Sequence, residues 1–310
     1  MERASNVSLH DDRLTELAVE IDARLARGTD EIEVAFGTTG LLERDVNLVF
    51  FETAVNFCFW SDLDSRVWML ERGGQRLGGW YSLAACFDRA VANGIPVYEA
   101  QYMANLTEVQ ARELFVGVDG IDIPLLSHRV RNLNQTGRYL LEKHKGQAVN
   151  MLASVGFSAP RLAELVANEL ASFRDGAVYA GRWVWILKRA QILGSDLSQL
   201  ANRYPSFHIE DCDQLTAFAD YRLPQVLRYY GVIHYTDTLA RRVDSGKHLE
   251  AGSSSEVEIR AATIVACEKL KQRLSNHTSA DIDLGLWLLS QDMRSDPMFA
   301  PHHRTLGLFY

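Results

Sequence analysis

Residues 158–170 read SAPRLAELVANEL, a stretch with the features of an amphipathic α-helix that has a defined start. Ser158 and Pro160 occupy the N-cap and first-turn places that these residue types prefer. The apolar positions that follow recur every three or four residues and so share one helix face. They are Leu162, Leu165, Val166, Leu170 and Phe173. The sequence therefore predicts a helix here with one buried side.

The same helical spacing appears near both ends of the chain. An early apolar stripe stops at Gly28, and a later one follows the acidic segment 256–258. Their members are Leu14, Leu17, Ala18, Ile21 and Leu25 in the first, and Ile264, Cys267, Leu270 and Leu274 in the second. The prevalence of this spacing predicts a mainly α fold.

Strand signals are few. Residues 67–70 and 77–81 flank the pair Gly73-Gly74, and residues 178–181 and 183–185 form a similar pattern, so we expect one or two small β-hairpins. Strands and helices do not alternate, which argues against a doubly wound sheet. The Gly- and Ser-rich loop at 245–255 is too short to separate independent domains. We therefore expect one helical domain over residues 1–310.

The composition limits the partners. With a formal charge of −8, the chain should repel a long anionic polymer, whereas two or three local cations suffice for one nucleotide phosphate. Four cysteines without a C-x-x-C pair suit a reducing compartment. We see no signal peptide and no apolar stretch near the roughly 20 residues that cross a bilayer. These features predict a cytoplasmic protein without a membrane partner.

Common catalytic and cofactor motifs do not occur. The chain has no phosphate-binding loop, no dinucleotide fingerprint and no nucleophile elbow. The pairs His302-His303 and His208/Cys212 have spacings that do not suit a metal site, so we expect none.

Three segments carry chemistry that is unusual for a purely structural helical protein. In the first, residues 56–62, aromatic side chains alternate with Asn, Ser and Asp, groups that hydrogen-bond base edges. The alternative is a buried helix end capped by Ser61 or Asp62. In the second, Lys188 and Arg189 directly follow an apolar run. Two cations that emerge from a buried stretch need a negative partner, either a phosphate or a carboxylate of the protein. The alternative is a basic helix start paired with Asp196 or another acid.

The third segment, residues 218–225, ends in a proline that suits the first turn of a helix running to Gly231. Residues before a proline avoid helical geometry, so residues 220–222 should connect two helices. The positive end of the helix dipole favours an ionised Asp220. Asp220 is therefore either a helix cap or a catalytic carboxylate.

Taken together and in this order, these segments resemble the queuosine salvage protein family, the queuosine 5′-phosphate N-glycosylase/hydrolases. The matching stretches lie at 56–62, 79–83, 93–96, 123–126, 172–175, 188–193, 218–225, 256–261 and 303–310. The likeness runs from about Asn47 onward, and the N-terminal helical region, residues 1–46, matches weakly. The chain departs from the family pattern at Leu288, where a carboxylate is expected after Trp287, and at Leu306, where a basic residue is expected.

The resemblance implies a helical fold related to DNA glycosylases and hydrolysis of queuosine 5′-phosphate to queuine and ribose 5-phosphate, without a cofactor. Such a reaction serves queuine salvage for tRNA modification. The family's catalytic carboxylate falls on Asp220 and its active-site lysine on Lys188. An ionised Asp suits this chemistry because N-glycoside hydrolysis passes through an oxocarbenium-like sugar.

The other expected contacts follow from the shape of the substrate. Phe218 and Trp60 suit stacking on the flat base. Asp283 or Asp62 suits the donors of the guanine-like edge, and Lys188, with Arg222 or His303, suits the phosphate or the sugar hydroxyls. Asn56 and Tyr221 complete the expected substrate contacts.

Two other functions remain open from sequence. One is a glycosylase acting on a base within DNA or RNA, which must grip a duplex and flip the base out. The net charge of −8 weighs against it. The other is a non-catalytic protein that binds queuine or its nucleoside. An ionised Asp on a connection between helices, near a cation, is more than such recognition requires.

Overall fold

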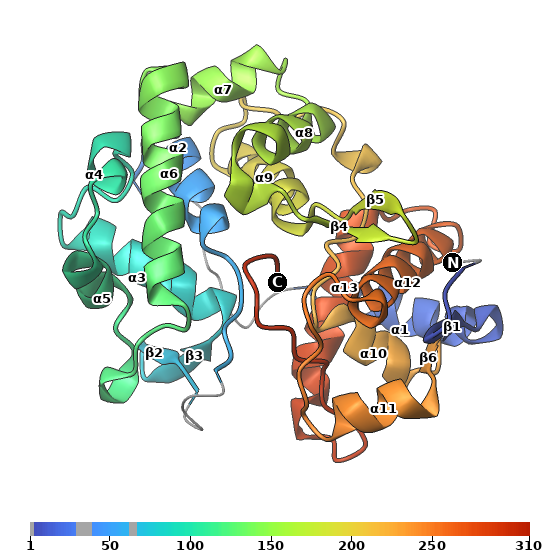
Figure 1. The fold of residues 1–310 in the computed structure, drawn as a ribbon. Coiled ribbons are helices and arrows are strands. Elements are labelled where there is room, and N and C mark those ends of the chain that lie inside the picture. The colour runs from blue at the N-terminus through green and yellow to red at the C-terminus, as the bar shows by residue number, and fades with distance from the viewer. Residues whose placement is uncertain (1–2, 29–38, 62–66) are drawn as a thin grey trace.

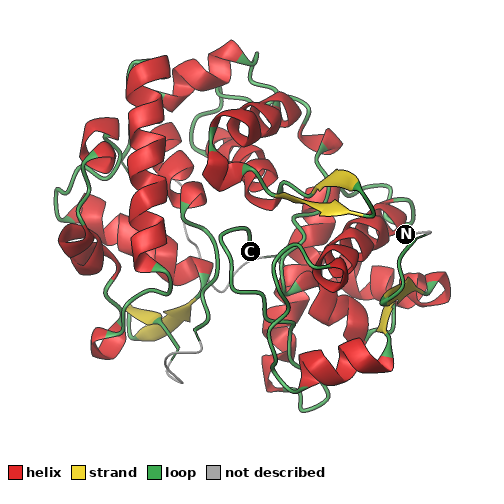
Figure 2. Ribbon diagram, in the orientation of Figure 1, coloured by secondary structure: helices red, strands yellow, loops and turns green. Residues whose placement is uncertain are grey.

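We describe a computed structural model of the chain, which covers residues 3–28, 39–61 and 67–310 (Figure 1). Helices dominate these residues, and the strands form only two-stranded antiparallel sheets (Figure 2). The predicted mainly α fold class is confirmed. Within the described residues, no helix combines the length and apolar character needed to cross a membrane.

The α-helices of the described residues are α1 (Leu14–Ala26), α2 (Leu42–Ala54), α3 (Trp80–Ala92), α4 (Ala100–Ala104), α5 (Glu108–Phe115), α6 (Leu126–His144), α7 (Ala148–Ser154), α8 (Ala159–Glu169), α9 (Lys188–Ser198), α10 (Leu223–Tyr229), α11 (Asp237–Asp244), α12 (Ser254–Lys271) and α13 (Ser279–Asp292). The strands pair as β1 (Val7–Leu9) with β6 (Ile233–Tyr235), β2 (Met69–Arg72) with β3 (Gln75–Gly78), and β4 (Gly176–Tyr179) with β5 (Arg182–Trp185).

The two largest hydrophobic clusters among the described residues divide them into two lobes. The first lobe, residues 42–207, packs α2 to α9 around side chains such as Phe50, Leu133 and Leu193. The second lobe combines residues 7–27 with residues 215–299, so α1 packs against α12 and α13 despite its distance in sequence (Figure 1). The C-terminal segment, residues 300–310, runs between the two lobes.

The helix ends predicted at Gly28, Ser158 and Gly231 are confirmed, whereas α8 ends at Glu169, so Leu170 and Phe173 of its predicted stripe lie beyond it. Helix α1 ends before Gly28, whose φ of +75° terminates it, and α10 is followed by Gly231 at +68°. Helix α8 begins directly after Ser158. The Ser158 hydroxyl does not cap this helix, however, because it donates a hydrogen bond to the carboxylate of Asp211 (2.7 Å).

Both predicted hairpins are present. Gly73 and Gly74 join β2 to β3 with φ angles of +58° and +79°, the backbone that a two-residue turn between twisted strands requires. Residues 180–181 join β4 to β5 in the same way. The second strand of the first hairpin is shorter than predicted, since Trp80 and Tyr81 already belong to α3.

Gly137 allows α4 and α6 to pack closely. A Cβ here would lie 2.4 Å from the Ala104 backbone nitrogen and 2.7 Å from the Ala100 carbonyl oxygen, so the helices would have to separate. We expect Gly137→Ala to lower the free energy of unfolding by about 1–3 kcal/mol, measured by urea denaturation. Gly78→Ala is the control, because its Cβ would meet nothing within 4 Å. Equal stability of the two variants would contradict the close packing.

Candidate active site

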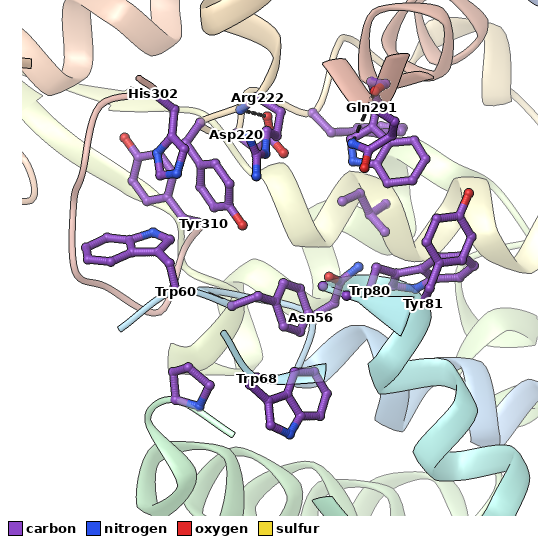
Figure 3. Close-up of a pocket in the computed structure, with 18 of the residues that line it drawn as sticks. Asn56, Trp60, Trp68, Trp80, Tyr81, Asp220, Arg222, Gln291, His302 and Tyr310 are labelled. Atoms are coloured by element: carbon purple, nitrogen blue, oxygen red, sulfur yellow. Dashed lines mark hydrogen bonds between the residues drawn. The ribbon is translucent and has the colours of Figure 1, made fainter. Parts of the chain in front are cut away.

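A large cavity of about 1980 Å³ lies where the two lobes and the C-terminal segment meet. The first lobe lines it with residues after α2 and at the start of α9, and the second lobe lines it with residues 218–222 and with α13. Figure 3 shows Asp220 and Arg222 facing Asn56 and Trp60 across this space, with His302 and Tyr310 at one end. The cavity thus gathers residues that lie far apart in sequence.

Asp220 lies on the connection that leads into α10. Its Oδ1 accepts hydrogen bonds from the backbone N–H groups of Arg222 (2.7 Å) and Leu223 (3.0 Å). Among the residues that the structure describes, Oδ2 has no hydrogen-bond partner. The side chain is half-buried and lines the cavity. Asp220 therefore caps a helix with one oxygen and leaves the other available.

The element before this connection differs from the prediction. Residues 212–214 form a single 3-10 turn, and residues 215–222 run without regular structure to α10. Asp220 thus follows an irregular segment rather than an α-helix. The predicted helix start at Pro224 is confirmed.

Lys188 is the first residue of α9, and its side chain is buried against the cavity wall. Its Nζ lies 3.5 Å from the carbonyl oxygen of Asn56. Burial lowers the pKa of Lys188 to about 8, and the positive charges of Arg189 and Arg260 act in the same direction. The negative charges of Asp220 and Asp283 oppose this change. Lys188 and the two carboxyl groups of the second lobe therefore line the same cavity and influence one another by charge.

Arg189 has a different environment from its neighbour. Its guanidinium donates hydrogen bonds to the carbonyl oxygens of Thr53 and Ala54, at the end of α2, and to that of Ser172. Arg129, also buried, binds the next carbonyls, at Val55 and Phe57. Two arginines thus bind the carbonyl oxygens at the end of α2. Asp62, one of the two caps expected as the structural alternative, lies outside the described residues.

Asp283, on α13, binds the backbone of the segment that carries Phe218. Its Oδ1 accepts the Phe218 N–H at 2.7 Å. Burial raises the pKa of Asp283 well above its usual range, and the negative charge of Asp220 adds to this effect. Two carboxyl groups of one cavity are therefore held in contrasting environments, Asp220 half-buried and Asp283 buried. Such contrast is typical of sites that need one ionised and one protonated acid.

Aromatic side chains form much of the remaining wall. Phe218, Trp60 and Tyr221 line the cavity, as does the buried Asn56. The guanidinium of Arg304 lies 5.6 Å from the Trp60 ring centroid, and the Tyr221 ring lies 4.5 Å from that of His302. Arg222 also reaches the cavity and donates a hydrogen bond to Gln225 (3.1 Å).

His302 and His303 lie on opposite sides of the C-terminal segment. His302 lines the cavity, where burial lowers its pKa to about 4. His303 points away and contacts the Tyr310 hydroxyl with its Nε2 (3.2 Å). Successive residues of an extended segment alternate in direction, so a His-His pair alone cannot indicate which member faces the site.

Other cavity residues were not predicted from sequence. Tyr310 is buried by its place between the lobes, and Asp196, about two helix turns beyond Lys188, lies in the wall with its pKa raised to about 7 by burial. Trp287 contacts Tyr81, with ring centroids 5.3 Å apart. These residues or their segments are named in the sequence-based predictions without a place in the site, because tertiary packing is what brings them to the cavity. Among the described residues, no three His, Cys, Asp or Glu side chains group as metal ligands.

Comparison with known proteins gives a consistent result. The model of a family described as queuosine salvage protein matches residues 38–310. A protein of Sphaerobacter thermophilus is 39% identical over 268 residues, covering 85% of this chain and 81% of that protein. Proteins of Mus musculus (34% over 282 residues; 87% and 83%) and Schizosaccharomyces pombe (30% over 291 residues; 86% and 84%) are also similar. All three are named queuosine 5′-phosphate N-glycosylase/hydrolase.

Proposed function

The chain belongs to the queuosine salvage protein family, and we propose that it hydrolyses the N-glycosidic bond of queuosine 5′-phosphate, releasing queuine and ribose 5-phosphate. The observation that carries this proposal is the carboxylate of Asp220, which lines the cavity with Oδ1 fixed by two backbone N–H groups and Oδ2 without a partner among the described residues. The two lobes act as one domain in this proposal, because both line the cavity.

Asp220 acts on the sugar. As the bond from C1′ to the base nitrogen breaks, its electron pair leaves with the base and C1′ becomes positive. The free oxygen of Asp220 stabilises that charge, and a water oxygen then bonds to C1′. The proton that this water loses is taken up by the departing base, which leaves as neutral queuine. Because two N–H groups already orient the carboxylate, little reorganisation is needed during the reaction.

Phe218 and Asp283 bind the base. The Phe218 ring stacks on the flat heterocycle, with Trp60 as a further aromatic contact. Burial raises the pKa of Asp283, and in its protonated form this carboxyl group donates a hydrogen bond to the base. This bond draws electron density toward the leaving group. A 7-deazaguanine has no N7 to protonate, so activation must come from another position on the base.

Lys188 and Arg222 supply positive charge. With a pKa of about 8, Lys188 is mostly an ammonium at neutral pH, and it lines the same cavity as Asp220. It binds the sugar hydroxyls or the phosphate, and Arg222 assists from the start of α10. Asn56 and Tyr221 complete the wall around the substrate.

Product analysis tests the proposed function. Purified protein incubated with queuosine 5′-phosphate should release queuine and ribose 5-phosphate in equal amounts, measured by liquid chromatography and mass spectrometry. Queuosine nucleoside in a parallel reaction measures what the phosphate contributes. Stoichiometric binding of the nucleotide without any sugar product over hours would refute hydrolysis.

We expect Phe218→Leu to raise KM about tenfold, while kcat changes by less than about threefold, because base–aromatic stacking contributes mainly to binding. Steady-state kinetics with queuosine 5′-phosphate would measure both constants. Phe207→Leu is the matched control, since Phe207 is similarly buried in the first lobe but is not among the residues lining the cavity. An unchanged KM in Phe218→Leu would contradict the stacking role.

A further inference from the structure

The segments 172–175 and 256–261 contribute no residue to the cavity wall, yet they meet in one buried ion pair. The guanidinium of Arg260, on α12, donates two hydrogen bonds to the carboxylate of Asp175 (2.8 and 2.7 Å). Both side chains are about 3% exposed. Asp175 belongs to the first lobe and Arg260 to the second, so the pair joins the lobes.

Asp175 holds the start of the helix that carries Lys188. Its Oδ2, besides binding Arg260, accepts the backbone N–H of Lys188 at 2.9 Å. Its carbonyl oxygen accepts the N–H groups of Ile186 and Leu187, each at 3.1 Å. Leu187 has a φ of +56°, a conformation that a branched residue adopts only where its neighbours enforce it. Asp175 therefore fixes both the direction and the position of the Lys188 backbone.

Arg260 holds the segment that carries Asp220. Its Nε donates a hydrogen bond to the carbonyl oxygen of Ala219 at 3.0 Å, one residue before Asp220. Its Nη2 reaches the carbonyl oxygen of Phe309 (3.2 Å), and the guanidinium lies 4.6 Å from the Tyr310 ring centroid. One side chain thus binds the first lobe, the Asp220 segment and the C-terminal segment.

We propose that Arg260 and Asp175 form a positioning pair that sets the distance between Asp220 and Lys188 across the two lobes. The chain of contacts is short: Lys188 N–H to Asp175, Asp175 to Arg260, and Arg260 to the carbonyl before Asp220. Neither member of the pair touches the substrate. The effect of the pair on turnover rests on the proposed function, whereas its effect on the distance between Asp220 and Lys188 does not.

An ion pair at this place restricts how the two lobes can be arranged relative to each other. A buried pair adds little net stability compared with apolar residues of the same size, but it admits few alternative arrangements. A planar guanidinium that is bound on several sides fixes both partners at once. Displacement of a reacting group by about 1 Å is enough to reduce turnover by about 100-fold.

Arg260→Lys tests the pair by kinetics. A lysine retains the positive charge beside Asp175, but one ammonium cannot replace both the two-point contact with Asp175 and the contact with Ala219. We expect kcat to fall about 100-fold and KM to change by less than about threefold. The matched control is Arg228→Lys, which breaks another two-point pair of the second lobe, with Asp244 (2.6 and 2.9 Å), and should retain kcat within about twofold.

Asp175→Asn provides a second variant in case Arg260→Lys does not fold. Its amide oxygen can still accept the Lys188 N–H, so α9 keeps its start while the ion pair is lost. The same loss of kcat is expected, counted per folded molecule. If both variants retain kcat within about threefold, or lose it only in proportion to unfolded protein, the positioning role is overturned.

Crystal structures separate this inference from the proposed function. The distance between the Asp220 carboxylate and the Lys188 Nζ should differ by about 1 Å between the wild type and Arg260→Lys. An unchanged distance overturns the inference, whatever the substrate is. A wild type that does not hydrolyse queuosine 5′-phosphate would refute the proposed function, and the distance would still decide the positioning role.

Discussion

Asp220→Asn should lower kcat for queuine release by about 10³-fold or more, because it removes the negative charge that opposes the positive C1′ in the transition state. The substitution keeps the shape of the side chain. An Asn oxygen can accept the same two backbone N–H groups, from Arg222 and Leu223, and Asn caps helices about as well as Asp. The loss should therefore appear in turnover and not in folding.

Thermal unfolding and substrate binding provide the controls for this variant. Asp220→Asn should unfold near the wild-type temperature and still bind queuosine 5′-phosphate with similar affinity. Asp213→Asn is a matched comparison, since Asp213 is an exposed aspartate shortly before the same connection, and it should retain kcat within about twofold. Turnover by Asp220→Asn at the wild-type rate would remove the mechanism proposed for this site.

Lys188→Met should lower kcat/KM about 100-fold and, at the same time, make the protein more stable at pH 7. Burial lowers the pKa of Lys188 from 10.5 to about 8. Folding at neutral pH therefore removes a charged ammonium from water, which costs free energy. A shift of this size corresponds to about 3 kcal/mol, which is the upper limit of the expected gain. Methionine fills the same space without a charge.

The pH dependence follows from the direction of this shift. Because the folded-state pKa is lower than the unfolded one, the destabilisation is fully present below pH 8 and disappears as the pH rises from about 8 to 10.5. Between about pH 8 and 10.5, the free energy of unfolding of the wild type should therefore rise relative to that of Lys188→Met. Activity should decline above pH 8 as the ammonium loses its proton.

Chemical denaturation at several pH values, together with pH–rate profiles, measures both effects. Lys269→Met controls for the loss of one positive charge, since Lys269 pairs with Asp11 at the surface and does not line the cavity. A Lys188→Met variant with wild-type kcat/KM would show that the ammonium takes no part in the reaction.

Local features of the fold were readable from sequence because local forces determine them. Pro224 and Gly231 delimit α10, and Gly73-Gly74 sets a hairpin turn, through restrictions on their own backbone angles. The two lobes were not foreseen, because apolar spacing shows that a helix has a buried face but not which helix covers it. The packing of α1 against α13, from opposite ends of the chain, is one such case.

The candidate site shows the same limit. Asp220 and Lys188 could be identified through their segments and the family resemblance, and both line the cavity. Without the family resemblance, the residue pattern alone would not distinguish Lys188 from Arg189, since adjacent residues at a helix start differ only in which neighbours surround them. The raised pKa of Asp283 also depends on burial created by distant segments. The Asp175–Arg260 pair spans 85 residues and has no local pattern.

A crystal structure of Asp220→Asn with intact queuosine 5′-phosphate tests the central claim most directly, since the slow variant should trap the substrate. We expect the side-chain atom that replaces Oδ2 to lie about 3–3.5 Å from C1′, on the face opposite the base, with Phe218 against the heterocycle. A nucleotide bound with its C1′ beyond reach of residue 220, or nearer to another carboxylate, would contradict the account.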